Sequence, residues 1–468
     1  MKRVAILGAT GSIGRQAIEI VAQHPELELC ALQSGSTPLG ELAAEHAVEH
    51  AQIGGDPVRL LERSGPDIVL NAVVGFAGVR ATLWALEHGV TLALANKESL
   101  VAAGELAVAA HERGGGLLLP VDSEHSALHQ CLEGRDRASV AGLVLTASGG
   151  PFRGRTRDEL ADVTAEQALA HPTWRMGPKI TVDSATLANK GLELIEAHWL
   201  FGLPYDAIDV VVHPSSIVHS LVRLRDGALL AHMGLPDMRV PISFALTYPE
   251  RSATPLPGLD LASGLVLEFE APDLETFPLL ALAHPTWRMG PKITVDSAPL
   301  ANKGLELIEA HWLFGLPYDV IEVVVHPSSI VHSLVRLRDG ALLAHMGLPD
   351  MRVPISYALT YPSRSATPVP QLPLEGLTLA FEAVDDHVFP LLGLARAAGE
   401  VGGTAPCAYN AANEVAVAAF LEGRLAFADI ASVVEETLAR VDGAPARDLD
   451  ELREADRQAR ELVGAAWA

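Results

Sequence analysis

Short apolar runs alternate with helical patterns over the first 120 residues of the chain. Runs at 4–7, 27–32, 67–71 and 90–95 have the length of buried strands, and an amphipathic helix is expected at 79–88. Parallel strands that are buried on both faces read as continuous apolar runs joined by helices. The pattern therefore predicts an α/β fold that begins with a doubly wound parallel sheet.

The later part of the chain contains one pattern twice. Residues His171 to Pro249 (copy 1) recur at His284 to Pro362 (copy 2), an offset of 113 residues, and the 79 positions differ at four places. The exchanges are Thr186 to Pro299, Ala207 to Val320, Asp209 to Glu322 and Phe244 to Tyr357. A second unit of this size must fold as another domain or compete with the first for the same neighbours.

Composition narrows the classes of function. The 468 residues suggest two to four domains of roughly 150 residues, and 49% hydrophobic residues suffice for large cores. A net charge of -24 argues against nucleic acid or an anionic membrane as the main partner, because both attract basic surfaces. No apolar run approaches the ~18 residues of a membrane span, and the N-terminal run resembles a strand more than a signal peptide. Three widely spaced cysteines predict neither a disulfide framework nor a zinc site, which fits a reduced, cytoplasmic location.

A glycine-rich turn joins the first predicted strand to the first helix. Gly8, Gly11 and Gly14 stand at three-residue intervals, and such a turn lets the backbone approach a pyrophosphate at the helix N-terminus. A tight connection without a ligand is the alternative. The second strand ends at Gln33 to Thr37 without the carboxylate that binds a ribose 2'-hydroxyl, so its hydroxyl side chains favour NADP over NAD.

Polar clusters follow two further predicted strands. Asn96, Lys97 and Glu98 come at the carboxyl end of a strand, where open α/β sheets place ligands, although they also suit a capped helix start. Asp122 and Glu124 stand two residues apart after the next strand. They can hold a hard divalent cation through oxygen, or they can cap a helix.

Copy 1 contributes a third polar group, on a predicted helix. Asn189 and Glu193 share one face with Lys190 close by, and Asp183 and Ser184 are expected to cap this helix. An exposed ion pair here would contribute little to stability. The flanking residues are small or apolar, which indicates instead that the group faces a cavity. Only six lysines occur among 34 basic residues, so each is a candidate for a site that needs a compact ammonium.

Nine motifs follow one another along the chain: GATGSIG, ANKES, PVDSEHSA, SGGPF, HPTWRMG, VDSATLANKGLE, HPSSIVHS, PDMR and NAANE. Together they resemble the 1-deoxy-D-xylulose 5-phosphate reductoisomerase family over essentially the whole length, once one copy of the repeat is removed. The resemblance implies an oxidoreductase of isoprenoid precursor synthesis that uses NADPH and a divalent cation (Mn, Mg or Co). It implies a sugar phosphate substrate, which is rearranged to a branched aldehyde and reduced, and a homodimeric assembly.

The resemblance also implies the order of domains. A Rossmann-like NADPH-binding domain is expected at 1–121, and an α+β catalytic domain with copy 1 at 122–283. Copy 2 of the catalytic domain is expected at 284–395 and a C-terminal helical domain at 396–468.

Site residues carry over from the family motif by motif. The resemblance places cofactor contacts at Thr10, Gly11, Ser12, Ile13, Gly35, Ser36, Thr37, Asn96, Glu98 and Gly177, and metal ligands at Asp122, Glu124 and Glu193. It places catalytic and substrate-binding groups at Lys97, Ser123, Glu124, Ser148, His171, Ser184, Asn189, Lys190 and Glu193, with Trp174, Met176, Ser216, His219 and Met238 lining the pocket. Copy 2 repeats these groups at His284, Gly290 (cofactor), Ser297, Asn302, Lys303 and Glu306 (metal). Ser36 and Thr37 lack the cation that some members carry there.

The duplication leaves two hypotheses open. The chain is an active reductoisomerase that accommodates an extra domain, or a catalytically impaired nucleotide-binding relative in which the copies disrupt the active site. Intact carboxylates and lysines in both copies favour the first. Copy 1 is expected to supply the working site, because Asp122 is nearer in sequence to Glu193 than to Glu306 and because copy 2 has Pro299 near the start of the helix. The helical tail is joined directly to copy 2, which argues for the opposite choice.

Overall fold

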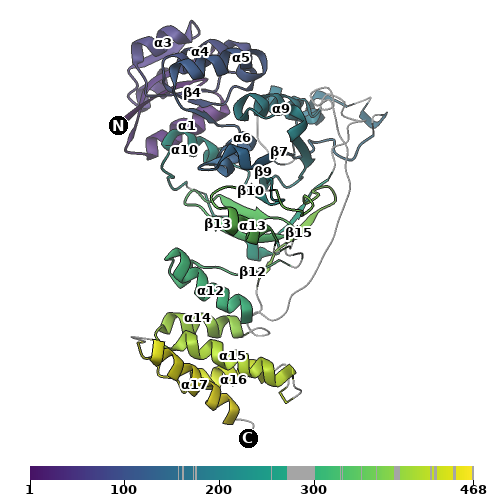
Figure 1. Cartoon of the computed structure of the whole chain (residues 1–468). Helices are drawn as coiled ribbons and strands as arrows, with labels where there is room; N and C mark the ends of the chain where they lie inside the picture. Colours follow the sequence, from purple (N-terminus) through teal and green to yellow (C-terminus); the bar gives the residue numbers. More distant parts are fainter. Residues whose placement is uncertain are drawn as a thin grey trace. The chain divides into compact units, whose positions relative to one another are not determined.

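The chain folds into two compact units, which the computed structural model describes except at 157, 161–162, 172, 174–176, 255, 271–300, 327, 329, 349, 351, 365, 384–389, 422–423, 426–428, 446–448 and 466–468. The first unit comprises 1–260, 266–294 and 328–380, and the second comprises 261–265, 295–327 and 381–468 (Figure 1). Among the helices of the described residues, none has the length and apolar character needed to cross a membrane.

The first unit begins with a six-stranded parallel sheet in the order β3-β2-β1-β4-β5-β6. Its strands are β1 (Lys2–Leu7), β2 (Leu27–Ser34), β3 (His50–Ile53), β4 (Ile68–Asn71), β5 (Thr91–Leu94) and β6 (Leu118–Pro120). The connecting helices are α1 (Ser12–Gln23), α2 (Gly40–Glu45), α3 (Pro57–Ser64), α4 (Val79–Glu87) and α5 (Lys97–Gly114). The order reverses between β1 and β4, which is the switch point where such sheets bind ligands. The predicted doubly wound sheet is confirmed.

Apolar side chains cover both faces of this sheet. Ile18 of α1 and Ile242 of α10 (Arg239–Thr247) belong to the core on one face. Leu60 of α3 and Ala85 of α4 belong to the core on the other face, which α5 also covers (Figure 1). Because α10 lies in copy 1, copy 1 completes the core of this six-stranded parallel sheet, which is called the nucleotide-type sheet below.

The glycine turn after β1 is sterically determined. Gly8 has a φ of 81°, and a Cβ there would lie 2.4 Å from the carbonyl oxygen of Ala72. A Cβ at Gly14 would lie 2.4 Å from the carbonyl oxygen of Gly8. Helix α1 therefore starts against the end of β1 at a distance that only glycine permits.

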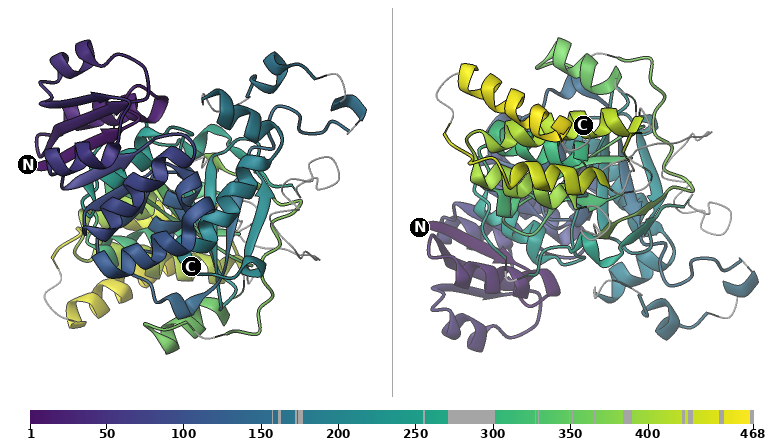
Figure 2. Two further views of the ribbon diagram at one scale, coloured as in Figure 1. Left: turned by 90° about the horizontal axis from the view of Figure 1, so that it is seen from above. Right: turned by 90° about the horizontal axis from the view of Figure 1, so that it is seen from below.

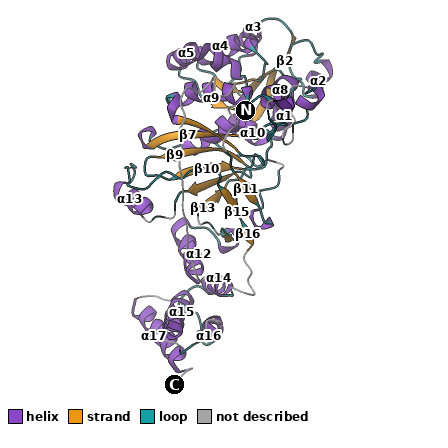
Figure 3. Cartoon of the chain, turned by 90° about the vertical axis from the view of Figure 1, so that its right-hand side faces the viewer, coloured by secondary structure: helices purple, strands orange, loops and turns teal. Residues whose placement is uncertain are grey.

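A second, mixed sheet of the first unit has the order β13-β14-β10-β9-β7-β8 (Figure 3). Its strands are β7 (Val140–Ala147), β8 (Ile208–Val212), β9 (Val218–Leu224), β10 (Leu229–Met233), β13 (Val331–Arg336) and β14 (Leu342–Met346). The helices of this part are α6 (Ser123–Leu132), α7 (Ala165–Ala168), α8 (Pro178–Ala185), α9 (Ala188–Phe201) and α13 (Arg352–Thr360), and a small pair joins β11 (Val266–Glu268) to β15 (Thr378–Ala380). Copy 1 supplies β8 to β10, and copy 2 supplies β13 and β14.

The second unit is mainly helical and confirms the expected helical C-terminus. It contains α12 (Ala301–Phe314), α14 (Leu391–Val401), α15 (Ala405–Leu421), α16 (Asp429–Leu438) and α17 (Leu449–Ala465), with the short pair β12 (Val324–Val325) and β16 (Glu382–Ala383). The C-terminal helices lie alongside one another (Figure 2). Leu307 of α12 and Tyr409 of α15 share one core.

Copy 2 does not reproduce the surroundings of copy 1. Ile242 in α10 is fully buried, whereas its equivalent Ile355 in α13 is 52% exposed. Helix α12 has the same sequence as α9, yet its end exposes Trp312, Leu313 and Phe314, each by two thirds or more. Identical segments therefore meet different neighbours.

The expected cap of the lysine-bearing helix is wrong. Asp183 and Ser184 lie in the last turn of α8, not before α9. Helix α9 instead follows Leu187, which has a φ of 56° and provides no side-chain cap. Leu187 therefore separates two helices, α8 and α9. The sequence pattern had indicated a single helix with Asp183 and Ser184 as its cap.

Candidate active site

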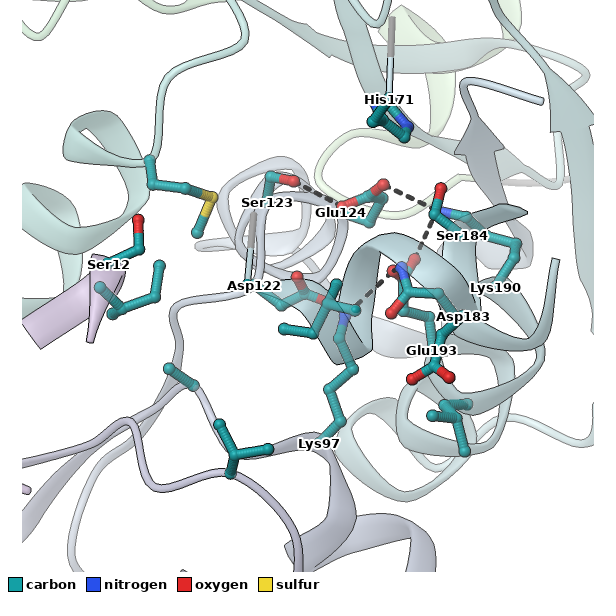
Figure 4. Close-up of a pocket in the computed structure, with 18 of the residues that line it drawn as sticks. Ser12, Lys97, Asp122, Ser123, Glu124, His171, Asp183, Ser184, Lys190 and Glu193 are labelled. Atoms are coloured by element: carbon teal, nitrogen blue, oxygen red, sulfur yellow. Dashed lines mark hydrogen bonds and ion pairs between the residues drawn. The ribbon is translucent and has the colours of Figure 1, made fainter. Parts of the chain in front are cut away.

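A cavity of about 250 Å³ lies within the first unit, between the glycine turn and helices α8 and α9. Of the predicted site residues, it is lined by Gly11, Ser12, Ile13, Lys97, Glu98, Asp122, Ser123, Glu124, Ser148, His171, Gly177, Ser184, Asn189, Lys190, Glu193 and Met238. Residues far apart in sequence, from the end of β1 to copy 1, thus face one space (Figure 4).

Three carboxylates converge in this cavity. Asp122 precedes α6, Glu124 lies in its first turn, and Glu193 comes from the middle of α9. One oxygen of each lies within 4.8 Å of the others. Hard divalent cations such as Mg²⁺ prefer oxygen ligands of this kind. The donor set therefore fits the expected metal, with Glu193 of copy 1 as the third carboxylate.

Two buried lysines lie among the carboxylates. Lys97, the first residue of α5, donates to Asp122 and lies 3.0 Å from Glu193 Oε1. Lys190 lies 2.7 Å from Glu124 Oε1 and also donates to Glu193 (Figure 4). These ammonium groups balance part of the carboxylate charge where water is largely excluded. Removing one member of such a group leaves an uncompensated buried charge.

The charged groups of the cluster shift one another's pKa values. Burial disfavours the charged form of Lys97, but the carboxylates of Asp122 and Glu193 hold its pKa well above the usual value. The pKa of Lys190 is likewise raised by Glu124 and Glu193 against the effect of burial. Burial and the charge of Glu124 raise the pKa of Glu193. Both lysines are therefore cationic at neutral pH.

Two residues behind the carboxylates were missed from the sequence. His125 is fully buried, and its Nε2 lies 2.8 Å from the carbonyl oxygen of Glu193. Its Nδ1 lies 3.2 Å from Asp122 and 3.4 Å from Glu196. Against the effect of burial, the charge of Glu196 and the bond to Asp122 raise the pKa of His125 to about 9. The signal was the three-residue spacing of His125 from Asp122 and of Glu196 from Glu193, which puts each on the same helix face as its partner.

Hydroxyl and imidazole groups line another part of the cavity. Ser148 Oγ lies 2.9 Å from His171 Nε2 and accepts a hydrogen bond from the backbone N–H of Gly150 at 3.2 Å. Burial lowers the pKa of His171, so its ring is neutral at pH 7. Asn189 Nδ2 donates to Glu193 Oε1 at 2.5 Å. These groups suit a polar or anionic part of a substrate.

The predicted cofactor residues fall into two sets. Gly11, Ser12, Ile13, Glu98 and Gly177 line the cavity. Thr10 and the exposed Gly35, Ser36 and Thr37, which follow β2, are not among its lining residues. Asn96 is buried. Its side chain caps α5 by accepting from the N–H of Ser99 at 3.0 Å, and it donates to the carbonyl oxygen of Val73 at 2.7 Å.

Among the remaining predicted residues, those that the structure describes do not line this cavity. Ser216 and His219 are buried without lining it. Trp174, Met176, His284, Gly290 and Ser297 lie outside the described residues. Asn302, Lys303 and Glu306 belong to α12 in the second unit, where Glu306 is exposed. Among the described residues, Glu193 of copy 1 provides the third carboxylate of the cluster, and a metal role of Glu306 stays a prediction.

A glycine turn at a sheet switch point and a cluster of three carboxylates with two lysines line one cavity. This combination defines a metal-dependent oxidoreductase that binds a dinucleotide. Family models for 1-deoxy-D-xylulose 5-phosphate reductoisomerase match residues 4–56 and 41–104, and its C-terminal domain matches 118–201 and 263–314. A further DXP reductoisomerase C-terminal domain matches 346–462. The chain belongs to the 1-deoxy-D-xylulose 5-phosphate reductoisomerase family.

Individual relatives agree with this assignment. The reductoisomerase of Geobacillus is 38% identical over 99% of each chain, and that of Heliobacterium modesticaldum is 49% identical over 62% of this chain and 81% of its own. A solved DOX-P reductoisomerase in complex with NADPH, fosmidomycin and magnesium is 30% identical, covers 99% of this chain and 98% of its own, and has a TM-score of 0.52. The Zymomonas mobilis enzyme in complex with NADPH is 32% identical over 100% of this chain and 99% of its own, with a TM-score of 0.51.

Proposed function

We propose that this chain is an active reductoisomerase that converts 1-deoxy-D-xylulose 5-phosphate to 2-C-methyl-D-erythritol 4-phosphate with NADPH and a divalent cation. The observation that carries this proposal is the convergence of Asp122, Glu124 and Glu193 with two lysines beside the glycine turn. A catalytically impaired relative is the alternative, but the copy 1 site retains each of these groups in one cavity.

The metal-binding residues are Asp122, Glu124 and Glu193. Their three oxygens fit magnesium or manganese, and a solved relative contains magnesium. The cation, when bound, supplies Lewis-acid polarisation of the substrate oxygens. His125 holds the backbone of Glu193 and the side chain of Asp122, and so orients two of the three ligands.

Lys97 and Lys190 remain charged in the buried cluster. Against the effect of burial, the charge of Lys97 lowers the pKa of Asp122 and the charge of Lys190 lowers that of Glu124, so these two carboxylates stay ionised. Both line the cavity and can donate hydrogen bonds to substrate oxygens. We therefore assign them to electrostatic stabilisation and to orientation of the substrate rather than to proton abstraction, since their pKa values are raised.

Ser148, Ser184, Asn189 and Lys190 are assigned to the substrate phosphate, and His171 is a further substrate contact. They offer hydroxyl, amide and imidazole groups to the cavity. Ser148 and His171 are already hydrogen-bonded to each other, which fixes the orientation of both. Such pre-orientation lowers the entropy cost of binding a phosphate.

The NADPH-binding residues begin at the glycine turn. Thr10 to Ile13 present the N-terminus of α1 to the pyrophosphate, and Gly35, Ser36 and Thr37 after β2 are assigned to the 2'-phosphate. Copy 1 contributes Gly177 to the lining of the same cavity. NADPH, when bound, supplies the hydride that reduces the branched aldehyde.

The proposal extends to the roles of the domains. Residues 1–121 bind NADPH, 122–283 carry catalysis, 284–395 hold the repeated segment and 396–468 form the helical end. A homodimer is the assembly expected from the resemblance. The presence of copy 2 affects the surface through which such a dimer would form. A cytoplasmic location is consistent with three free cysteines, of which Cys30 and Cys131 are buried.

The proposal is tested on the purified full-length chain. NADPH absorbance should fall only when substrate and Mg or Mn are both present, and mass spectrometry should identify the branched polyol phosphate as the product. Absence of turnover at every metal concentration, in a protein that still binds NADPH, would establish the impaired relative instead.

A further inference from the structure

Copy 1 and copy 2 meet through the same strand. β10 and β14 both read LLAHM and pair antiparallel, with Ala231 opposite Ala344, its equivalent in the repeat. Leu229 lies opposite Met346, and Met233 lies opposite Leu342. The register is therefore symmetric about its central pair, as in a strand that pairs with a second copy of itself.

Two buried ion pairs repeat this symmetry. Arg251 lies two residues past the end of copy 1 and continues the repeat, and its Nη1 lies 2.6 Å from Asp339 Oδ2 of copy 2. The equivalent arginine of the second repeat, Arg364, makes the equivalent contact to Asp226 of copy 1. Asp226 and Asp339 are at most 2% exposed. Each repeat thus supplies one arginine and one carboxylate to the other.

Hydrogen bonds outside the strands are reciprocal as well. Thr254 Oγ1 donates to the carbonyl oxygen of Asp339 at 2.9 Å, and Thr367 Oγ1 donates to that of Asp226 at 2.5 Å. In the same way, Arg223 Nη1 donates to Leu372 O at 3.2 Å and Arg336 Nη1 donates to Leu259 O at 3.0 Å. Every one of these contacts has a partner shifted by the repeat offset.

Reciprocity of this kind is the mark of a two-fold interface between identical subunits, where residue i contacts j and j contacts i. Tandem repeats that merely stack contact each other through different faces. We infer that copy 2 occupies, within this one chain, the place of a second subunit at the edge strand β10, so that the chain contains both halves of a dimer-type interface.

The rest of the first unit agrees with this role of copy 2 as a replacement for a second subunit. Copy 1 keeps its place on the nucleotide-type sheet, since Ile242 of α10 lies in the core of that sheet. The corresponding Ile355 of α13 is half exposed. Copy 2 therefore brings the interface of a second subunit without a second glycine turn. It also covers the edge of β10, which would otherwise present unpaired backbone groups to other chains.

A pair of cysteines tests whether the contact lies within one chain. In the full-length chain, Ala231→Cys combined with Ala344→Cys places the two thiols directly opposite each other. After mild oxidation, we expect a disulfide that leaves the protein at the mass of one chain, 49.5 kDa, on a non-reducing gel. A product at twice that mass, or no disulfide between these positions, would overturn the inference.

The single variant Ala231→Cys is the matched control. If β10 pairs with β10 of another chain, the symmetric register puts this cysteine opposite itself and oxidation links two chains. We expect no such product because β14 covers the edge, and a linked pair of chains would refute the proposal.

A second measurement serves if the cysteine variants do not fold. Arg364→Ala and Asp226→Ala, singly and together, are compared by thermal unfolding over a wide range of protein concentration. The inference requires non-additive shifts in Tm that do not depend on concentration. Additive shifts, or a coupling that grows with concentration, would contradict it. Turnover is not the readout, so the outcome is independent of the proposed reductoisomerase activity.

Discussion

Lys97 Nζ, at the start of α5, lies 3.0 Å from Glu193 Oε1 in the middle of α9. This contact links the helices that follow the nucleotide-type sheet to copy 1. The equivalent of Glu193 in copy 2, Glu306, is exposed on α12 in the second unit. The geometry thus separates the two otherwise identical glutamates and leads to a direct test.

Glu193→Gln should reduce kcat/KM by more than the ~100-fold that loss of an outer metal partner typically costs, because a direct ligand is removed. Glu306→Gln, the matched control with the same local sequence, should leave kcat/KM within about twofold of the unaltered chain, since surface changes rarely matter. Both are assayed at saturating metal. Loss of activity in Glu306→Gln alone would show that copy 2 forms the working site.

Removal of the metal should abolish turnover. A chelator is expected to stop NADPH oxidation, and Mg or Mn should restore it, because Asp122, Glu124 and Glu193 provide an oxygen-only site. NADPH binding, followed by fluorescence, serves as the control for intact protein. Turnover that is indifferent to the chelator would disprove the metal assignment.

NADPH should bind more tightly than NADH. No carboxylate follows β2, and Ser36 and Thr37 offer hydroxyl donors to a 2'-phosphate. The dissociation constants of both cofactors can be compared by fluorescence titration. Equal values would contradict the assignment of this turn.

Gly14→Ala should destabilise the first unit. Its Cβ would lie 2.4 Å from Gly8 O and 2.6 Å from Ala9 Cα, and backbone cannot easily move away. We expect the free energy of unfolding to fall by about 1–3 kcal/mol. Gly40→Ala, where a Cβ meets nothing within 4 Å, is the control and should change it by less than ~0.5 kcal/mol. Similar stabilities of the two variants by denaturant titration would refute the steric account.

His213 should make stability depend on pH. Its ring is fully buried, stacks on Phe269 and has Nδ1 2.7 Å from the carbonyl oxygen of Glu268. Burial lowers its pKa to about 4. As the pH falls, His213 is therefore protonated in the unfolded chain before it is protonated in the folded one. Its contribution to the free energy of unfolding is complete above pH 6.5 and is lost as the pH falls towards 4. That loss is roughly 3 kcal/mol. His213→Asn should show a weaker fall over this interval in denaturant titrations, and an unchanged fall would exclude His213 as the cause.

The sequence predicted those elements whose local residue pattern matches the surroundings that they have in the fold. Strands of the first sheet are apolar because both faces are buried, so their positions could be read directly. The break at Leu187 could not, because a left-handed residue in the middle of an apolar pattern leaves no compositional mark. His125 and Glu196 were missed because their role depends on the packing of α6 against α9.

The repeat shows the physical limit of prediction more clearly. α10 and α13 differ by one aromatic exchange, yet Ile242 is buried and Ile355 is half exposed. Intrinsic preference makes both segments helical. Burying both would need a second parallel sheet of this kind, and the described residues form one.

The exposed end of α12 has a consequence for the life of the protein in a cell. Trp312, Leu313 and Phe314 form a run of large apolar side chains, exposed by 74%, 67% and 71%. Such runs are what chaperones and quality-control proteases recognise, and they promote precipitation at high concentration. We therefore expect aggregation and proteolytic degradation to limit the yield and half-life of the chain, even when its active site is intact.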